Sequence, residues 1–284
     1  MKTLCALALF AVTAFGQNSI DKPRLESYLR RLELLIPAVK IEISDPVPTP
    51  YLQGFSSVTV QFSYNDQRKE EHYMVSSDGE TLIRGEAFPL KRSPFQSNID
   101  RMKTEGQPSF GGPPNAPVTL VMYVDLQCPF CKAESAVVRN NVEKTFGNKV
   151  RVVFRDFPVV EVHPWAGMAA IAARCIYRQN EKKFWNFHDW IFDKQAEVTM
   201  ENFNTRVNKW VADNGVKAAD FATCSSTKAT EPEIAASIQE GKSLGVGATP
   251  TTFLNGSKME GTIEWDVLRQ LINVELERVG AGGK

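Results

Sequence analysis

The sequence predicts an α/β protein preceded by a small α+β module. An apolar, β-branched run at 118–124 is followed by a helical pattern at 133–146 and a second apolar run at 150–157. This order of strand, helix and strand indicates a parallel βαβ unit with a right-handed crossover. A helix and several short strands precede it at 17–86, and a stretch rich in proline and glycine, 87–117, separates the two parts.

The chain begins with a pattern typical of a secretion signal. Lys2 precedes an apolar run, and Ala14-Phe15-Gly16 fits a small-x-small cleavage site. We therefore expect residues 1–16 to be removed and the protein to be exported to the periplasm or the extracellular space, where disulfides are permitted. The 33 basic and 33 acidic residues balance, so the composition predicts no nucleic-acid partner.

The module at 17–86 begins with a helix and continues as an antiparallel meander. Apolar residues recur at spacings of three and four between Asp21, a common N-cap residue type, and Pro37. Alternating apolar residues then mark three strands, at 58–62, 73–75 and 81–84. A unit of this size has only a modest core of its own.

The composition of 87–117 predicts a turn or two of helix at 95–103 and otherwise a linker that is semi-rigid where proline dominates. We place the domain boundary in this segment and the larger domain at 118–284. Within that domain a helical pattern extends from about 164 to 245, and its aromatic stripe is best explained by a helix packing its core face. A hairpin at 251–261 and a helix at 265–276 close the chain.

The first strand of the larger domain leads to a Cys-x-x-Cys motif at the start of a helix. Cys128 would lie at the helix N-terminus, the more exposed of the pair, where the first N–H groups and the helix dipole lower a thiol pKa. Pro129 fixes the entry into the helix, and Phe130 is apolar and neutral, so these two residues tune the stability of thiolate and disulfide. Cys131 would lie one turn inside the helix. The motif favours Cys128 as nucleophile and Cys131 as resolving thiol.

A zinc site and a purely structural disulfide are the alternatives for this motif. Zinc needs a second pair of ligands. Neither the other cysteines nor the three histidines, His72, His163 and His188, have metal-ligand spacing. We predict no metal and no dissociable cofactor, because the redox-active disulfide Cys128–Cys131 would itself be the redox centre.

Two segments resemble DsbA-like thioredoxin-fold proteins: YVDLQCPFC at 123–131 and GVGATPTTFLNG at 245–256. The resemblance covers about 110–280 and implies a thioredoxin-like fold whose helical section is an insertion lying over the active site. It also implies that the Thr249–Pro250 bond is cis and faces the Cys-x-x-Cys motif, with the Thr249 backbone pairing with an extended substrate. An ordinary trans proline beginning an edge strand is the alternative.

One position departs from the pattern of this family. Related enzymes often carry a buried acid six residues before the first cysteine, where this chain has Met122. Asp125 is the nearest acid to Cys128, and alternation along the strand places it on the opposite face from Met122. Asp125 is therefore the candidate proton relay, with water as the alternative.

The remaining cysteines of the mature chain are Cys175 and Cys224. Cysteines in an exported protein tend to pair, so if Cys128 and Cys131 form one disulfide, these two form the other. That structural disulfide would close a loop of about 50 residues. Two buried free thiols are the alternative.

The module at 17–86 resembles the N-terminal dimerisation module of DsbC- and DsbG-type isomerases, in segments 54–58 and 75–85. The whole chain thus resembles an exported thiol–disulfide oxidoreductase. Its expected partners are unfolded or reduced protein substrates and a redox partner protein, in the membrane or outside it. A dimeric isomerase joined through the module is one alternative, and a non-catalytic chaperone or binding module that uses the same cleft is another.

Overall fold

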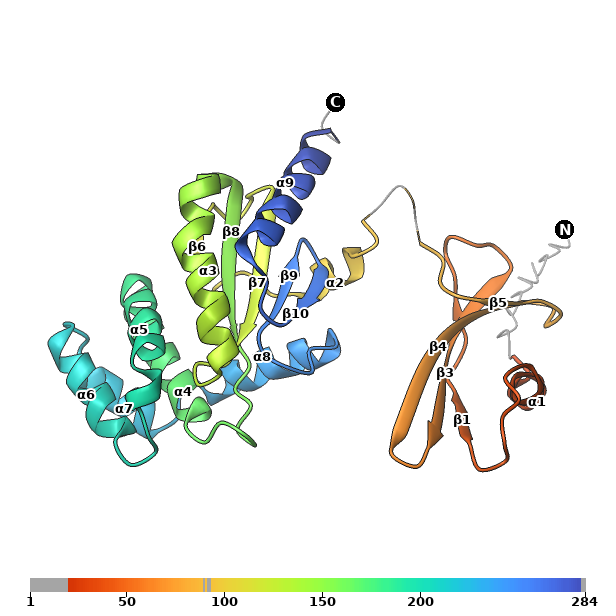
Figure 1. The fold of residues 1–284 in the computed structure, drawn as a ribbon, viewed down its shortest axis with the longest axis horizontal. Coiled ribbons are helices and arrows are strands. Elements are labelled where there is room, and N and C mark those ends of the chain that lie inside the picture. Colours follow the sequence, from red (N-terminus) through yellow and green to blue (C-terminus); the bar gives the residue numbers. More distant parts are fainter. Residues whose placement is uncertain (1–19, 89, 91–92, 282–284) are drawn as a thin grey trace, which may run out of the picture. The chain divides into compact units, whose positions relative to one another are not determined.

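The computed structural model describes residues 20–88, 90 and 93–281 of the 284-residue chain. The predicted signal peptide, 1–16, lies outside the described residues. The chain divides into two compact units, Met1–Pro94 and Phe95–Lys284, which can be followed in Figure 1. Each unit has its own sheet and its own buried hydrophobic cluster.

The first unit is a helix packed on an antiparallel sheet. The strand order is β1-β3-β4-β5, with β2 paired to β3. The bounds are α1 (Lys22–Leu32), β1 (Lys40–Ile43), β2 (Val47–Pro48), β3 (Phe55–Tyr64), β4 (Gln67–Ser76) and β5 (Leu82–Arg84). The Asp21 carboxylate caps α1 by accepting the backbone N–H of Arg24 at 2.9 Å. Leu25 and Leu29 share one buried cluster with the inner face of β3, as the predicted helix and meander require.

The second unit is built on a mixed sheet with the strand order β10-β9-β7-β8-β6. The bounds are β6 (Ser109–Gly111), β7 (Val118–Val124), β8 (Val150–Asp156), β9 (Thr251–Leu254) and β10 (Ser257–Glu260). β7 and β8 run parallel, and the other pairs are antiparallel. β8 is buried at every position and β7 at all but one, because helices cover both faces of these strands. The predicted βαβ unit is present.

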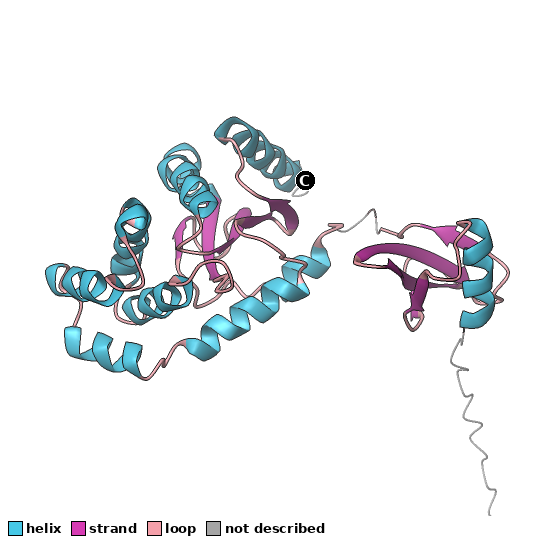
Figure 2. Ribbon diagram, turned by 60° about the horizontal axis from the view of Figure 1, so that its bottom comes forward, coloured by secondary structure: helices cyan, strands magenta, loops and turns pink. Residues whose placement is uncertain are grey.

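Helices pack on both faces of this sheet (Figure 2). On one face, Leu120 and Met122 of β7 share the largest core with α3 and α9, and α4 to α7 extend that core. On the other face, Val121 and Tyr123 pack against α8 and the residues that follow it. The bounds are α3 (Pro129–Phe146), η1 (Gly147–Lys149), α4 (Ala166–Tyr177), α5 (Glu181–Asp193), η2 (Gln195–Glu197), α6 (Phe203–Asp213), α7 (Ala218–Ser226), α8 (Glu231–Ser243) and α9 (Trp265–Ala281).

The linker predicted at 87–117 is shorter in the structure, because its residues 95–117 belong to the larger unit. It contains α2 (Gln96–Arg101) and β6, which pairs with β8. Gly111 has a φ of +80°, and a Cβ atom there would lie 2.4 Å from the carbonyl oxygen of Val150. The glycine therefore permits close packing against the sheet instead of flexibility.

Candidate active site

Cys128 and Cys131 lie where β7 passes into the active-site helix α3. Cys128 is the N-cap residue of α3, and Pro129 takes the first helical position, where its missing N–H leaves no bond unmade. Both cysteines are free thiols, the reduced form of the pair. Cys128 is 3% exposed and Cys131 is fully buried, so the first cysteine is the more accessible one only by a small margin.

The two thiols have opposite acidities. Hydrogen bonding from the Cys131 thiol is the largest effect on Cys128, and with the backbone N–H groups of Cys131 and Phe130 it lowers the pKa of Cys128 to about 6. Cys128 is therefore mainly thiolate at neutral pH. Burial raises the pKa of Cys131 well above its ordinary value, so Cys131 keeps its proton. An attacking Cys128 and a resolving Cys131 would need these opposite acidities, and the two roles stay predictions.

The loop before β9 faces the motif. The Thr249–Pro250 peptide bond is cis, so the alternative of an ordinary trans proline is wrong. The Cys128 sulfur lies 3.4 Å from the carbonyl oxygen of Thr249. The carbonyl oxygen of Pro250 accepts the backbone N–H of Gly261 at 2.9 Å, which ties this loop to the segment after β10.

Asp125 is buried beneath the turn that carries the cysteines. Its carboxylate accepts the backbone N–H groups of Gln127 at 2.7 Å and of Val159 at 2.8 Å, and lies 2.8 Å from Nδ1 of His163. Its own backbone N–H donates to the Cys131 sulfur at 3.4 Å. Asp125 thus joins the active-site turn to the loop after β8. Sequence reasoning did not find His163 as a partner of Asp125, because 38 positions separate the two residues.

Residues of the helical section contact the same turn. The side-chain amide of Gln195 donates to the carbonyl oxygens of Leu126 and Cys128, at 3.1 and 3.2 Å. The side-chain oxygen of Gln127 accepts the backbone N–H of Trp165 at 2.7 Å. The insertion therefore holds the conformation of the turn, and spacing in the sequence did not indicate these contacts.

Glu134 is a further buried acid, one turn after Cys131 on α3. Its side chain has no exposed surface. One carboxyl oxygen, Oε2, accepts the backbone N–H of Ile263 at 2.8 Å, and Oε1 has no hydrogen-bond partner. Burial, with a smaller effect from the charge of Glu264, raises the pKa of Glu134 to about 7. Sequence reasoning missed this residue because a charged residue in a helix is normally solvated.

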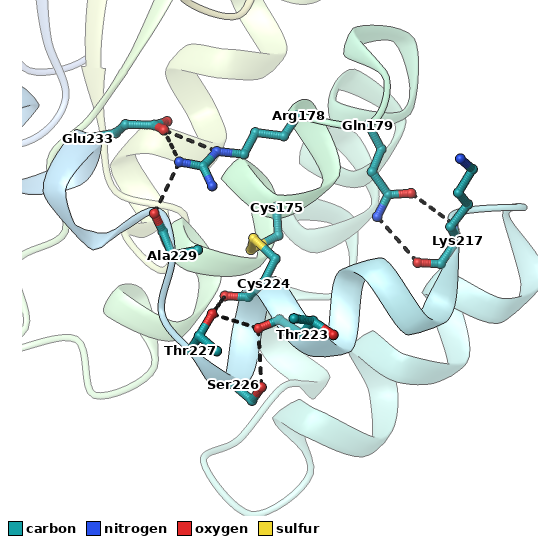
Figure 3. Close-up of a disulfide and its surroundings, with 10 residues drawn as sticks. All are labelled: Cys175, Arg178, Gln179, Lys217, Thr223, Cys224, Ser226, Thr227, Ala229 and Glu233. Carbon is teal, nitrogen blue, oxygen red and sulfur yellow. Dashed lines mark hydrogen bonds and ion pairs between the residues drawn. A yellow bond between two sulfur atoms is a disulfide. The ribbon is translucent and has the colours of Figure 1, made fainter.

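A disulfide joins Cys175 of α4 to Cys224 of α7, with Cα atoms 5.8 Å apart (Figure 3). This is the pairing that the sequence predicted. Two neighbouring contacts join the end of α4 to α8 and to the residue before α7. Arg178 forms an ion pair with Glu233, and the side chain of Gln179 bonds both backbone groups of Lys217. The disulfide and these contacts lie within the helical insertion.

The described residues contain no cluster of three or more His, Cys, Asp or Glu side chains that could hold a metal ion. In the same part of the chain, no helix is long and apolar enough to cross a membrane.

Comparisons with known proteins identify the family and the fold of the second unit. A family model described as thioredoxin matches residues 103–274. Disulfide bond formation protein D of Bacillus subtilis is 27% identical over 191 residues, which cover 61% of this chain and 81% of that protein. The Na(+)/H(+) antiporter NhaA 3 of Salinispora tropica is 33% identical over 158 residues, 55% of this chain, and the chain spans only 23% of that protein.

The solved structure of alpha-DsbA1 from Wolbachia pipientis superposes on this chain with a TM-score of 0.58 at 20% identity. The match covers 66% of this chain and 100% of that one. It shows the fold of the second unit, a thioredoxin-like fold with a helical insertion, as the resemblance implied.

Proposed function

The chain belongs to the thioredoxin family, whose model spans residues 103–274, and from this premise we propose that it is an exported thiol–disulfide oxidoreductase acting on protein substrates. The observation that carries the proposal is the pairing of Cys128, a low-pKa thiol at a helix N-terminus, with the buried Cys131. Such a pair can take up and release a disulfide without any further group.

The exchange proceeds through a mixed disulfide. In the reduced protein, the Cys128 thiolate attacks a substrate disulfide, forming one S–S bond and releasing one substrate thiolate. Cys131 then attacks the Cys128 sulfur, which closes the Cys128–Cys131 disulfide and releases the second substrate thiolate. In the oxidising direction the same steps run in reverse, and the substrate leaves with a disulfide. The low pKa of Cys128 stabilises the reduced form, which favours donation of disulfides to substrates.

The surroundings of Cys128 suit an extended, partly apolar polypeptide. The Thr249 carbonyl group stands beside the sulfur, where the backbone of a substrate segment would pair with it. Phe130, two residues after Cys128, is 63% exposed. Val160 and Val162 are 55% and 66% exposed, on the loop whose Val159 N–H donates to Asp125 beneath the turn. Exposed apolar side chains around a reactive thiol favour unfolded protein substrates over small polar disulfides.

Export and partners are also part of the proposal. The pattern at 1–16 supports removal of a signal peptide and activity in the periplasm or the extracellular space. A redox partner protein would restore the working state of the cysteine pair. A homodimer joined through the 17–86 module would instead make the protein a disulfide isomerase. The molar mass of the mature protein in solution, measured by light scattering, separates these two forms.

The test is the reduction potential of the mature protein, measured by mass spectrometry of alkylated thiols in glutathione buffers. We expect the Cys128–Cys131 pair to titrate as a two-electron couple between about −120 mV, as for a strong oxidant, and about −270 mV, as for thioredoxin. A pair that stays reduced or oxidised across all buffers would contradict the proposal. The variant Cys128→Ser distinguishes the oxidoreductase from the chaperone alternative. A chaperone would still suppress aggregation of a reduced client protein after this substitution, whereas disulfide exchange would be lost.

A further inference from the structure

A recess lies between α3 and α5, beside the turn that carries Cys128. The backbone N–H of Lys132 donates to the carbonyl oxygen of Cys128 at 3.1 Å. Gln195, two residues beyond the end of α5, donates to the same oxygen at 3.2 Å. Both walls of the recess are therefore joined to the active-site turn. Its volume is about 310 Å³, and its walls include Lys132, Ser135 and Arg139 of α3 and His188, Asp189 and Asp193 of α5.

The charges of Arg139 and Asp189 cancel across the recess. The guanidinium group of Arg139 donates to both carboxylate oxygens of Asp189, at 3.1 and 2.8 Å. Nδ1 of His188 lies 2.9 Å from one of the same oxygens. Burial lowers the pKa of His188, so its ring is neutral near pH 7. These three side chains therefore leave no net charge in the recess.

Lys132 is the cation of the recess that remains without a counter-charge. Asp193 lies 3.2 Å from Nζ of Lys194 and is 71% exposed, so its charge is both paired and solvated. Lys132 is half-buried and forms no ion pair among the residues that the structure describes. Its ammonium group has three hydrogen-bond donors and no acceptor. An anion that enters the recess would therefore meet one unpaired positive charge.

Ser135 adds a hydrogen-bond donor on the same wall. It follows Lys132 by three residues, a spacing that makes side chains neighbours on one face of a helix. Ser135 is 4% exposed, and its hydroxyl has no hydrogen-bond partner within the described part of the chain. Buried hydroxyls are nearly always bonded, so this one is available to a group that enters the recess. A carboxylate only accepts hydrogen bonds, and it matches both the ammonium group and the hydroxyl.

The recess is within reach of a substrate joined to Cys128. Lys132 is four residues beyond Cys128, about 6 Å along the helix axis at a rise of about 1.5 Å per residue. An extended segment covers about 3.3 Å per residue, so a side chain about two to four positions from the substrate cysteine spans this distance.

We propose that this recess is a substrate subsite for the carboxylate of an aspartate or glutamate side chain near the reactive cysteine of a protein substrate. The proposal rests on the proposed function and adds a preference among substrates. Lys132 pairs with the carboxylate, and Ser135 donates a hydrogen bond to it, while the substrate is held in the mixed disulfide with Cys128. Both residues select the substrate by binding it and take no part in the exchange of sulfur bonds.

The experiment compares peptides that differ in one carboxylate. Each peptide has a single cysteine and has either Glu or Gln three positions before it or three positions after it. The cysteine is first coupled to dithiobis(nitrobenzoate), a small disulfide that leaves one thionitrobenzoate group on the peptide. When the Cys128 thiolate attacks the peptide sulfur, a Cys128–peptide disulfide forms and thionitrobenzoate leaves as a coloured thiolate. Stopped-flow absorbance with excess peptide gives the rate constant for the reduced mature protein.

The measured quantity is the ratio of the Glu to the Gln rate constant, in which the reactivity of Cys128 itself cancels. For the parent at low salt we expect a ratio of about three at one or both positions, as for a partly exposed ion pair. The ratio should approach one in 1 M salt, because the Debye length is then about 3 Å. Lys132→Gln should bring the ratio to about one, and Lys132→Glu should reverse the preference. Ser135→Ala should lower the ratio in part.

Lys144→Gln is the matched control, because Lys144 is an exposed lysine of the same helix outside the recess. It removes the same charge and should keep the ratio of the parent. Equal rate constants for the Glu and Gln peptides in the parent, or a ratio that Lys132→Gln leaves unchanged, would overturn this inference alone. Failure of the parent to release thionitrobenzoate from any of the peptides would overturn the proposed function and this inference with it.

Discussion

The sulfur of Cys128 lies 3.4 Å from the carbonyl oxygen of Thr249, although 121 positions separate the two residues. The strand order accounts for this proximity, because β9 pairs directly with β7, the strand that leads to the motif. The thiol and the backbone of an adjacent loop therefore meet at one end of the sheet. A substrate strand that bonds to this loop would bring its own sulfur to Cys128.

The acidity of Cys128 should depend on Cys131. The Cys131 thiol is the largest cause of the lowered pKa, so Cys131→Ala should raise the pKa of Cys128 from about 6 toward its ordinary value of 9.0. Thiolate absorbance in the ultraviolet, followed against pH in the reduced protein, measures this change. In the parent, the thiolate signal should rise as the pH passes through 6. An unchanged midpoint in Cys131→Ala would show that the helix N–H groups alone stabilise the thiolate.

The Cys175–Cys224 disulfide should contribute to stability and not to exchange. It joins cysteines 49 positions apart, and in the chain-entropy model a loop of this length stabilises the folded state by about 4 kcal/mol. The double substitution Cys175→Ala, Cys224→Ala should lower the free energy of unfolding in urea by roughly this amount.

The double variant still contains the active-site cysteines, Cys128 and Cys131, so its exchange reaction can be compared with that of the parent. The rate at which the Cys128 thiol of the folded double variant reacts with dithiobis(nitrobenzoate) should equal that of the parent. A slower reaction would mean that the disulfide also positions the active-site turn, through the contacts between Gln195 and that turn.

Asp125 should be required for the structure of the active-site turn. Asp125→Asn replaces one accepting oxygen by an N–H₂ group, so the backbone N–H of Gln127 or of Val159 loses its acceptor. We expect a loss of about 1–3 kcal/mol in the free energy of unfolding. Asp193→Asn is the control, because Asp193 is 71% exposed and its ion pair contributes little. Equal urea midpoints for the two variants would contradict this role.

Asp125 and Glu134 show which features of the candidate site can be predicted from the sequence. The apolar runs around the motif predict β7, α3 and β8, and the two quoted segments predict the cis proline, because these signals are local or belong to a family pattern. The burial of Glu134 depends on Ile263, which is 129 positions away, and no periodicity along α3 reveals it. Asp125 was selected for its distance in sequence from Cys128, while its partner His163 arrives from another loop.

The part of the predicted linker that belongs to the larger unit, 95–117, shows a different limit of the sequence analysis. β6 spans three residues, too few for a periodic pattern to be recognised, whereas α2 lies where a turn or two of helix is expected, at 95–103. The prolines and glycines around these two elements indicate flexibility when taken alone. In the fold, Gly111 lies against the backbone of Val150, and the side chain of Asn98 donates to the carbonyl oxygen of Gly256. Tertiary contacts of this kind determine the structure of such short segments.

Glu134 should make stability fall as the pH rises. Its pKa is raised from 4.5 in the unfolded chain to about 7 in the folded protein. Below pH 4.5 the group is protonated in both states and has no effect. Between pH 4.5 and pH 7 the unfolded chain releases the proton while the folded protein keeps it, so folding becomes less favourable by up to about 3 kcal/mol. Above pH 7 the loss is complete and constant.

Glu134→Gln removes this titration, so its free energy of unfolding minus that of the parent should increase between pH 4.5 and pH 7 and then level off. Urea unfolding of both reduced proteins at a series of pH values measures the difference, in which the contribution of Cys128 cancels. Glu143→Gln, an exposed acid on α3, should show no such pH dependence. A constant difference for Glu134→Gln would contradict this prediction, because it would mean that the carboxyl group ionises freely in the folded protein.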